Sequence, residues 1–441
     1  MVCLQLIKLS KVSFFSLLRK FFATFDARIA PQRGFVDGYQ SEQTMKNRFL
    51  ICLAALLGLV SCSKSYYDGS YPADVAYKMD GLSYMNGGGQ GRPGGEAGVL
   101  TAGEWNDLTH WDFWSGVMGS EEYKDMAAYW GFHTPRRVSV RVADNGGKRL
   151  SAVKVVLEQD RKVIWSTLTD NQGEAELWVA PFREQASIDG LSLLVDGTRM
   201  PEAPKVTPWN VQQAEADVNY YQLSVQTPTA EKKADIAFIV DATGSMSDEI
   251  DFLKKDLENI LNRVKGGQGD IELRTGTVFY RDEGDDYLTR HSDFTGDYGK
   301  TVNYIKQQQA GGGGDLPEAV HTALEAGLQD LHWNLSARAR IAFLILDAPA
   351  HQDHQGVVES LQKSVETYAA MGIKLIPVFC SSPSKECEFM CRFFAVLTGG
   401  TYVFLTDDSG VGESHVEPTV GEYQVEPLND LLARLIAKYI G

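Results

Sequence analysis

The middle part of the chain shows a regular alternation of apolar and polar residues. Val138, Val140 and Val142 are separated by polar residues, and later runs repeat this period of two, which is typical of strands with one buried face. Turn sequences such as Asp170-Asn-Gln-Gly separate the runs. We therefore predict a small antiparallel β-sandwich over residues 135–226.

A different pattern follows from residue 233 to the end of the sequence. Residues 235–240 form a continuous apolar run, which is typical of a parallel strand covered on both faces, and the next segment carries its apolar residues on one helical stripe. Further strands are predicted at 272–280, 341–346, 373–379 and 401–405, and helices at 300–309, 316–331, 355–371, 384–397 and 428–440. This order predicts a doubly wound, mainly parallel, Rossmann-like α/β domain over residues 233–441, with ligands bound beyond the carboxyl ends of its strands.

One hairpin of the predicted sandwich carries a family signature. Residues 169–177, Thr-Asp-Asn-Gln-Gly-Glu-Ala-Glu-Leu, resemble the Thr-Asp-x-x-Gly-x-Ala pattern of carboxypeptidase-regulatory-like and other Ig-like modules of exported proteins. The resemblance covers this hairpin alone. It implies a spacer or docking role for the sandwich, without chemistry of its own.

Residues 45–61 have the features of a secretion signal: a short basic start, about a dozen apolar residues and a small-residue end. The apolar stretch is shorter than the ~20 residues that a transmembrane helix needs. Residues 59–62, Leu-Val-Ser-Cys, resemble the lipobox of bacterial lipoproteins, which implies that Cys62 is lipidated and anchors the mature chain. An ordinary signal peptide cleaved near a cysteine is the alternative.

The segments on either side of this signal lead to further expectations. Residues 1–44 have no role ahead of a signal, so we expect Met45 to be the true start. Ser63 after the anchor favours the outer membrane by analogy with lipoprotein sorting. Whether the protein faces the periplasm or the outside of the cell stays open. Residues 62–134 are predicted to be a Gly-rich spacer and an aromatic segment, which either packs against the next domain or forms a carbohydrate-stacking surface.

The charge of the chain limits its partners. The formal net charge is −16 at pH 7, in a chain with 44% hydrophobic and 23% charged residues, the proportions of a globular protein. A negative surface repels phosphate backbones, because nucleic-acid binding depends on Lys and Arg that replace condensed counterions. We therefore expect no nucleic-acid partner and regard a divalent cation as a natural ligand.

Oxygen-bearing residues gather where strands of the predicted α/β domain end. Its first strand ends in Asp241-Ala-Thr-Gly-Ser, the strand at 341–346 ends in Asp347, and Gly311-Gly-Gly-Gly-Asp precedes a helix between them. Carboxylates and hydroxyls are hard donors that suit Mg²⁺, Mn²⁺ or Ca²⁺. A shared cation would relieve the repulsion between Asp241 and Asp347.

These three loops, in this order, resemble the metal-ion-dependent adhesion site (MIDAS) of the von Willebrand factor A (vWA) domain. The resemblance covers about residues 233–441. It implies that Asp241, Thr243 and Ser245 of the first loop and Asp347 of the last loop bind Mg²⁺, or Mn²⁺ or Ca²⁺ in its place. Thr243 stands where Ser is usual in the family.

The middle loop departs from the family pattern. The family usually has a Thr after its glycines, whereas here Asp315 follows them, with Glu318 close behind. We include Asp315 among the expected metal ligands, either directly or through a coordinated water. A third carboxylate also disfavours an incoming carboxylate from a partner, which usually completes the metal shell in this family.

Other polar residues near these loops have simpler explanations. Ser245 can also cap the helix that follows it. His351 and His354, with Asp353 between them, are expected to form loop hydrogen bonds and are less favoured as ligands. Residues 282–286, Asp-Glu-Gly-Asp-Asp, are expected to form a solvated hairpin turn, with a second cation as the alternative.

Three cysteines, Cys380, Cys387 and Cys391, follow the predicted anchor. An exported chain meets an oxidising compartment, so one disulfide with one thiol left over is possible. Three buried, inert thiols are the other possibility. A zinc site is not expected, because a fourth ligand and paired C-x-x-C motifs are missing.

These observations favour a membrane-anchored, non-enzymatic module that binds a protein ligand through a metal. Two alternatives are an envelope-assembly component in which the metal only stabilises the loops, and a metal-dependent hydrolase. A hydrolase needs a base near the metal, and His351 is the candidate. The sequence lacks the Gly-Lys-Ser/Thr of a phosphate loop and the Gly-x-Ser-x-Gly elbow of serine hydrolases, so we expect no enzyme.

Overall fold

The computed structural model describes residues 100–133, 136–184, 187–208, 211–224, 230–267, 269–380, 384–407 and 417–441. All of them fall within one compact unit, Asn86–Gly441. The predicted signal at 45–61, the segment 1–44 before it and Cys62 lie outside the described residues. Within the described part of the chain, no helix is both long enough and apolar enough to span a membrane.

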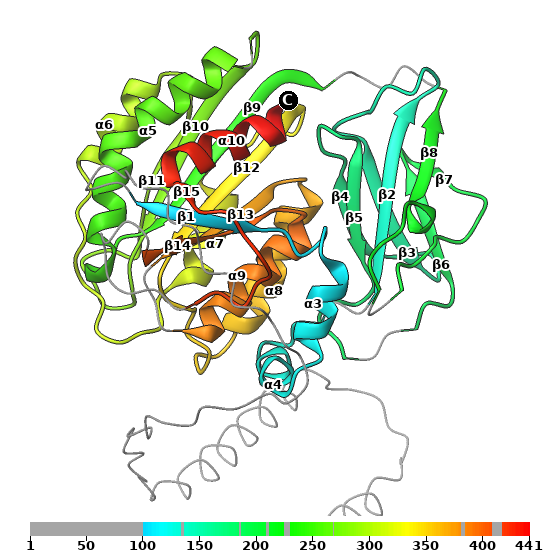
Figure 1. Ribbon diagram of the computed structural model, residues 1–441, viewed down its shortest axis with the longest axis horizontal. Helices are drawn as coiled ribbons and strands as arrows, with labels where there is room; N and C mark the ends of the chain where they lie inside the picture. Colours follow the sequence, from blue (N-terminus) through cyan, green and yellow to red (C-terminus); the bar gives the residue numbers. More distant parts are fainter. Residues whose placement is uncertain are drawn as a thin grey trace, which may run out of the picture. The chain divides into compact units, whose positions relative to one another are not determined.

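The centre of the structure is a sheet of eight strands in the order β11-β10-β9-β12-β13-β14-β1-β15 (Figure 1). Strands β10, β9, β12, β13 and β14 run parallel, while β11, β1 and β15 pair antiparallel at the two sides. The strands are β11 (Thr289–Thr295), β10 (Glu272–Tyr280), β9 (Glu231–Asp241), β12 (Ala337–Leu346), β13 (Lys374–Phe379), β14 (Tyr402–Thr406), β1 (Thr101–Trp105) and β15 (Glu426–Pro427). The mixed α/β fold with a mainly parallel sheet is confirmed.

Helices cover both faces of this sheet because its strands are apolar on both faces. In β9, Ile236 and Phe238 pack in one core cluster with α5 and α10, while Ala237 and Ile239 pack in the other with α7, α8 and α9. The helices are α5 (Ser247–Gly267), α6 (Tyr298–Lys306), α7 (Val320–Gln329), α8 (Val357–Ala370), α9 (Lys385–Thr398) and α10 (Leu428–Ile440). Every predicted strand and helix of this domain has a counterpart here.

Three strands of the large sheet were not predicted from the sequence. Strand β11 is polar and largely exposed, because it lies at the sheet edge and needs no apolar run. Strand β1 precedes the sandwich in the chain, yet pairs with β14 of the α/β domain. Residues 101–105, part of the predicted spacer and aromatic segment at 62–134, therefore belong to the large sheet.

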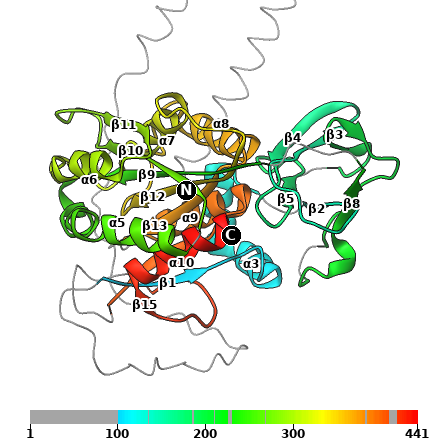
Figure 2. The ribbon, with the colours of Figure 1, turned by 90° about the horizontal axis from the view of Figure 1, so that it is seen from above.

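The sandwich consists of a three-stranded sheet, β5-β2-β8, and a four-stranded sheet, β4-β3-β6-β7 (Figure 2). Its strands are β2 (Arg137–Asp144), β3 (Lys154–Gln159), β4 (Lys162–Leu168), β5 (Glu174–Trp178), β6 (Leu191–Val195), β7 (Thr198–Arg199) and β8 (Asn219–Leu223). The pairs are antiparallel as expected, except that β2 and β8 run parallel. That exception depends on the route of the chain between 200 and 218, which periodicity does not reveal.

The aromatic segment packs against both domains. Helices α3 (Trp111–Met118) and α4 (Glu121–Trp130) follow β1, and their buried rings meet Trp178 of the sandwich and Phe389 of α9. Trp111, Trp114 and Trp130 are all 0% exposed. These three rings therefore serve as core, not as a surface for stacking carbohydrate.

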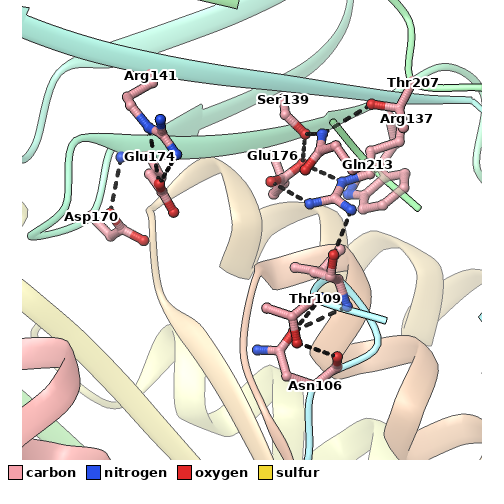
Figure 3. A network of polar contacts seen from close by, with 12 residues as sticks. Asn106, Thr109, Arg137, Ser139, Arg141, Asp170, Glu174, Glu176, Thr207 and Gln213 are labelled. Atoms are coloured by element: carbon pink, nitrogen blue, oxygen red, sulfur yellow. Dashed lines mark hydrogen bonds and ion pairs between the residues drawn. The ribbon is translucent and has the colours of Figure 1, made fainter. Parts of the chain in front are cut away.

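Polar contacts join the sandwich to its neighbours. Arg137 of β2 donates to both carboxylate oxygens of Glu176 at 2.8 Å and to the carbonyl oxygen of Leu108 at 2.8 Å. Figure 3 shows Arg137 reaching toward the segment that holds Asn106 and Thr109. The hairpin with the Ig-like signature contacts the α/β domain, because Asn171 donates to the carbonyl oxygen of Lys438 at 2.8 Å.

A cavity of about 400 Å³ lies at this interface. Among its lining residues, Arg141 pairs with Glu174 within the sandwich at 2.7 Å, and Lys374 of β13 pairs with Asp170 of the sandwich across the interface at 3.3 Å. Opposite charges across a partly buried interface fix orientation more than they add stability. The pair of Lys374 and Asp170 therefore helps to set how the sandwich meets the α/β domain.

A buried ion pair fixes β1 and the aromatic segment to the α/β domain. Arg392 of α9 is 0% exposed and donates to both oxygens of Asp107, at 3.0 Å from Nε and 2.6 Å from Nη2. Asp107 also accepts a hydrogen bond from Nε1 of Trp105 at 2.9 Å. Breaking such a buried pair is costly, although Arg392 keeps a weaker partner in Glu388, whose Oε1 lies 3.6 Å from its Nη1.

We expect Asp107→Ala to lower the free energy of unfolding by about 1.5–3 kcal/mol, because the buried Arg392 guanidinium loses both charge-assisted hydrogen bonds to this carboxylate. Urea unfolding of the purified protein measures this. Asp112→Ala is the matched control: Asp112 is exposed in the first turn of α3 and should cost less than about 1 kcal/mol. Equal losses in the two variants would contradict the anchoring role of the pair.

Candidate functional site

The site begins where the first parallel strand ends. Asp241 closes β9 and is 0% exposed, and its Oδ1 accepts hydrogen bonds from the backbone N of Thr243 at 2.8 Å and from Oγ1 of Thr243 at 2.7 Å. Oγ of Ser245 lies 3.5 Å from Oγ1 of Thr243. The short 3₁₀ helix Gly244–Met246 produces this tight loop, so the three oxygen-bearing side chains of the first predicted loop lie together.

The glycine loop packs directly against this first loop. The backbone N of Gly311 donates to the carbonyl oxygen of Ala242 at 3.0 Å, and that of Gly244 donates to the carbonyl oxygen of Gly312 at 3.2 Å. Gly313 has φ +73°, and a Cβ there would lie 3.2 Å from Cβ of Thr243 and 3.0 Å from Oε1 of Glu318. Glycine is required because the backbone adopts a left-handed conformation and has little space for a side chain.

The last loop completes the arrangement. Asp347 follows β12, the neighbour of β9 in the sheet, and is 6% exposed. Glu318 joins the glycine loop to this one, because its backbone N donates to the carbonyl oxygen of Pro349 at 2.9 Å and the residue forms a β-bridge with Ala350. The carboxyl ends of adjacent parallel strands meet at one edge of the sheet, so topology brings these loops together.

Four buried carboxyl groups influence one another at this edge. Burial first, and then the charge of Asp347, raises the pKa of Asp241 to about 7. Burial also raises the pKa of Glu249 to about 7 and that of Glu318 to about 9, with further contributions from neighbouring acidic groups, Asp241 and Asp347 among them. Without a cation, part of this cluster holds protons at neutral pH.

The donors that are present fit a hard divalent cation. Oδ2 of Asp241 and Oε2 of Glu318 are buried and have no hydrogen-bond partner among the described residues. The Tyr280 hydroxyl lies close enough to lower the pKa of Asp241, yet neither it nor Oδ2 completes a hydrogen bond of normal geometry. Buried oxygens without partners are costly, and a bound Mg²⁺, Mn²⁺ or Ca²⁺ would satisfy them.

The predicted ligands differ in their positions. Asp241, Thr243 and Asp347 are buried at the site, whereas Ser245 is exposed at its rim. Asp315 is exposed, and the carboxylate beside Gly313 and Thr243 belongs to Glu318. The backbone turn between Gly313 and α7 directs the side chain at 318 inward, a choice that spacing alone could not make.

Two buried residues of the site were not singled out by the sequence. Glu249, in the first turn of α5, is 5% exposed and faces the cluster. Arg281, just after β10, donates to the carbonyl oxygens of Ala242 at 3.1 Å and Gln309 at 2.8 Å. Its position one residue after a predicted strand end was the available signal. Arg281 therefore holds the first loop and the approach to the glycine loop together.

The acidic turn after β10 is only partly solvated. Glu283 and Asp286 are exposed, but Asp282 is 7% exposed and accepts a hydrogen bond from Nε2 of His351 at 2.5 Å. Our expectation of a solvated turn is therefore wrong for Asp282. His351 does form a loop hydrogen bond, as its sequence context indicated.

The three cysteines of the described chain, Cys380, Cys387 and Cys391, are free and buried. Burial raises the pKa of the Cys380 and Cys387 thiols well above the usual value. A high thiol pKa disfavours the reactive thiolate. Of the two possibilities left open by the sequence, the structure matches inert thiols.

The fold and the position of these loops define the class of protein: a doubly wound α/β domain with a polar site beyond its strand ends. Residues 235–375 match the von Willebrand factor A domain family. The chain therefore contains a vWA domain. The match runs from within β9 to the first two residues of β13 and includes all three loops of the site.

Two known proteins are similar to this chain over part of its length. It is 29% identical over 132 residues to the alpha-protein kinase vwkA of Dictyostelium discoideum, covering 30% of this chain and 21% of that protein. It is 32% identical over 117 residues to a protein named as an ariadne-like RING finger protein of Acanthamoeba polyphaga mimivirus, covering 26% and 11% respectively. The chain thus spans about a fifth of the length of the first relative and about a tenth of the length of the second.

A solved pilus adhesin, SpaC of Lactobacillus rhamnosus GG in its open conformation, is similar to this structure with a TM-score of 0.34. The match has 12% identity and covers 47% of this chain and 30% of the adhesin. A TM-score at this level supports no argument about function. The family match and the geometry of the site therefore carry the functional interpretation.

The raised pKa of Asp241 leads to a test by pH. Because the folded state holds this proton more tightly than the unfolded state, its contribution to stability is full below about pH 4 and is lost as pH rises toward about 7. In EDTA at pH 7.5 we expect Asp241→Asn to be more stable than the unaltered protein, and in excess Mg²⁺ less stable. Urea unfolding in both buffers measures this reversal.

The reversal is specific because the amide keeps the shape of the side chain and removes only its charge. Thr322→Ala, a change to a polar residue on α7 that is not a predicted metal ligand, serves as the control. Its free energy of unfolding should differ from that of the unaltered protein by the same amount in both buffers. An Asp241→Asn variant that is less stable in EDTA as well would mean that the charge at this position is not destabilising without metal.

Proposed function

We propose that this protein is a membrane-anchored, non-enzymatic module that binds a protein ligand through a divalent cation. The observation that carries the proposal is the buried set of oxygen donors at one edge of the vWA domain: Asp241, Thr243, Glu318 and Asp347. Such donors suit Mg²⁺, Mn²⁺ or Ca²⁺. Ser245, exposed at the rim, stands where a partner would approach the ion.

The composition of the site indicates the kind of partner. Domains of this family often bind a divalent metal and present it to a protein. Here three buried carboxylates, those of Asp241, Glu318 and Asp347, already outnumber the charge of one divalent ion. A fourth carboxylate from a partner would therefore be disfavoured, and we propose that a neutral oxygen, from an amide or a hydroxyl group, completes the metal shell.

A non-enzymatic role agrees with the position of His351. A metal-dependent hydrolase needs a base that can reach a water or a substrate at the ion. His351 is 4% exposed, and its Nε2 is engaged by Asp282. The similarity to a kinase covers only 21% of that protein and therefore gives no basis for assigning kinase activity to this chain.

The anchor and the location belong to the same proposal. The lipobox at 59–62 supports attachment through the lipid of Cys62, and Ser63 supports the outer membrane. The vWA domain and its sandwich would then be held near the membrane surface by the Gly-rich stretch that precedes residue 100. An envelope or extracellular protein is the expected kind of partner.

Calorimetric titration of Mg²⁺ and Mn²⁺ into the metal-stripped full chain tests the ion. We expect saturable binding that is lost in Asp241→Ala and weakened about tenfold or more, or about 1.4 kcal/mol, in Glu318→Gln. Asp315→Ala is the matched control and should bind as the unaltered protein does, because Asp315 is exposed. The chain must include residues 100–105, since β1 is part of the sheet.

Binding of envelope or extracellular proteins to the immobilised protein, with Mg²⁺ or with EDTA, then tests the role of the ion. Retention that requires Mg²⁺ and is absent in Asp241→Ala supports the proposal. Metal binding without any metal-dependent retention would favour the alternative in which the ion only stabilises the loops. No metal binding at all would refute both.

Lipidation is tested separately. In a bacterial host that processes lipoproteins, we expect Cys62→Ala to abolish incorporation of labelled fatty acid and to release the protein from the membrane fraction. Cys52→Ala is the control, because that residue lies inside the predicted signal and should change neither result. Labelled Cys62→Ala protein would contradict the anchor without affecting the proposal for the metal.

A further inference from the structure

A second group of metal-binding side chains lies in the loop between β12 and α8. One ligand atom from each of His351, Asp353 and His354 lies within 4.8 Å of the others. None of these residues belongs to the oxygen site at Asp241. We propose that they bind a late transition-metal ion such as Zn²⁺, at a site separate from the one that holds Mg²⁺.

His351 is oriented as a ligand. Its Nε2 donates to Oδ1 of Asp282 at 2.5 Å, and both side chains are buried, at 4% and 7% exposure. With its proton held toward the carboxylate, the ring leaves the lone pair of Nδ1 for a metal. A carboxylate that binds the far nitrogen of a ligating histidine is the usual second partner in such sites, since it fixes the tautomer and raises the basicity of the ring.

His354 and Asp353 are accessible and able to move. The side chain of His354 is 40% exposed, and its Nδ1 lies 3.5 Å from Oε1 of Glu283. The rings of His351 and His354 stack with their centroids 4.2 Å apart. The lone pair of an imidazole nitrogen lies in the plane of its ring, so two stacked, parallel rings cannot both direct theirs at one ion, and His354 must rotate out of the stack when it binds.

A third histidine offers an additional donor at the same edge of the domain. His321 lies in the first turn of α7, and its Nδ1 is buried without a hydrogen-bond partner among the described residues. Burial lowers its pKa, which the charges of Glu325, Glu283, His351 and His354 also influence, so His321 lies in their neighbourhood.

The two sites differ in the class of ion that they select. Imidazole nitrogens suit Zn²⁺, Cu²⁺, Ni²⁺ and Co²⁺, whereas the oxygens around Asp241 suit Mg²⁺, Mn²⁺ and Ca²⁺. Glu318 lies between them, because both Asp241 and Asp282 act on its pKa. An ion on His351 and His354 would fix the loop that begins with Asp347 and, through Asp282, tie it to the turn after β10.

Titration of Co²⁺ into the metal-stripped full chain, with Mg²⁺ present in excess, tests this inference. Visible absorption of Co²⁺ reports nitrogen ligands in a low-coordinate site. We expect one saturable Co²⁺ site from which Zn²⁺ displaces the ion. The absorption should persist in Asp241→Asn, because that change affects only the oxygen site.

The variants identify the ligands. We expect His354→Gln to weaken Co²⁺ binding about tenfold or more, and Asp282→Asn, which disturbs only the partner of His351, to weaken it about 10–100-fold. His354 is exposed enough that its replacement should leave the thermal transition unchanged, which separates a lost ligand from a lost fold. His332→Gln is the control, because that exposed histidine also pairs with a carboxylate, Asp293, at 2.8 Å.

Each other outcome would overturn the inference. Unchanged Co²⁺ binding in His354→Gln would show that the imidazoles are not ligands. Loss of the absorption in Asp241→Asn would mean that Co²⁺ occupies the oxygen site instead. Absence of any visible absorption with Co²⁺ in excess would leave His351 and His354 as loop hydrogen-bonding residues. Failure of Mg²⁺ binding, by contrast, would affect only the proposed function.

Discussion

The structure depends on the burial of several carboxyl groups at one edge of a parallel sheet. Asp241, Glu249, Glu318 and Asp347 are each at most 6% exposed. Burying a charge is costly unless it is paired, so these groups either hold protons or share a cation. The raised pKa of Asp241, to about 7, expresses this cost in the absence of an ion. A bound divalent cation would offset this repulsion, because the carboxylates would then coordinate the ion.

The rest of the α/β domain keeps these groups in place. The backbone bonds from Gly311 to Ala242 and from Gly244 to Gly312 hold the glycine loop against the first loop. Arg281 fastens the same region through two carbonyl oxygens. Rigid strands and short loops supply these donors, which would reduce the ordering cost of binding an ion.

The segments before the vWA domain have a structural part in the same unit. Strand β1 extends the large sheet, and the pair of Asp107 and Arg392 holds it to α9. The sandwich, inserted in the sequence between β1 and β9, contacts the α/β domain through polar pairs and through Nε1 of Trp178, which donates to the carbonyl oxygen of Leu397 at 3.2 Å. Any ligand bound at Asp241 would thus be held by a unit in which β1, the sandwich and the α/β domain pack together.

The sequence by itself determined the elements whose signal is local. Continuous apolar runs specified the parallel strands, helical stripes specified the helices between them, and the positions of Asp241 and Asp347 after two of those strands placed both at one edge of the sheet. Alternation in β2 and β3 likewise specified the sandwich, because a half-buried strand must follow a period of two.

Tertiary structure decided what depends on residues far apart in the chain. The pairing of β1 with β14 joins residues about 300 positions apart and leaves no local pattern. The burial of Glu318 and the exposure of Asp315 depend on how the turn after Gly313 directs its side chains, and the burial of Asp282 depends on His351 from another loop. Sequence specifies residue types and periods, whereas burial and proximity emerge only when distant segments pack.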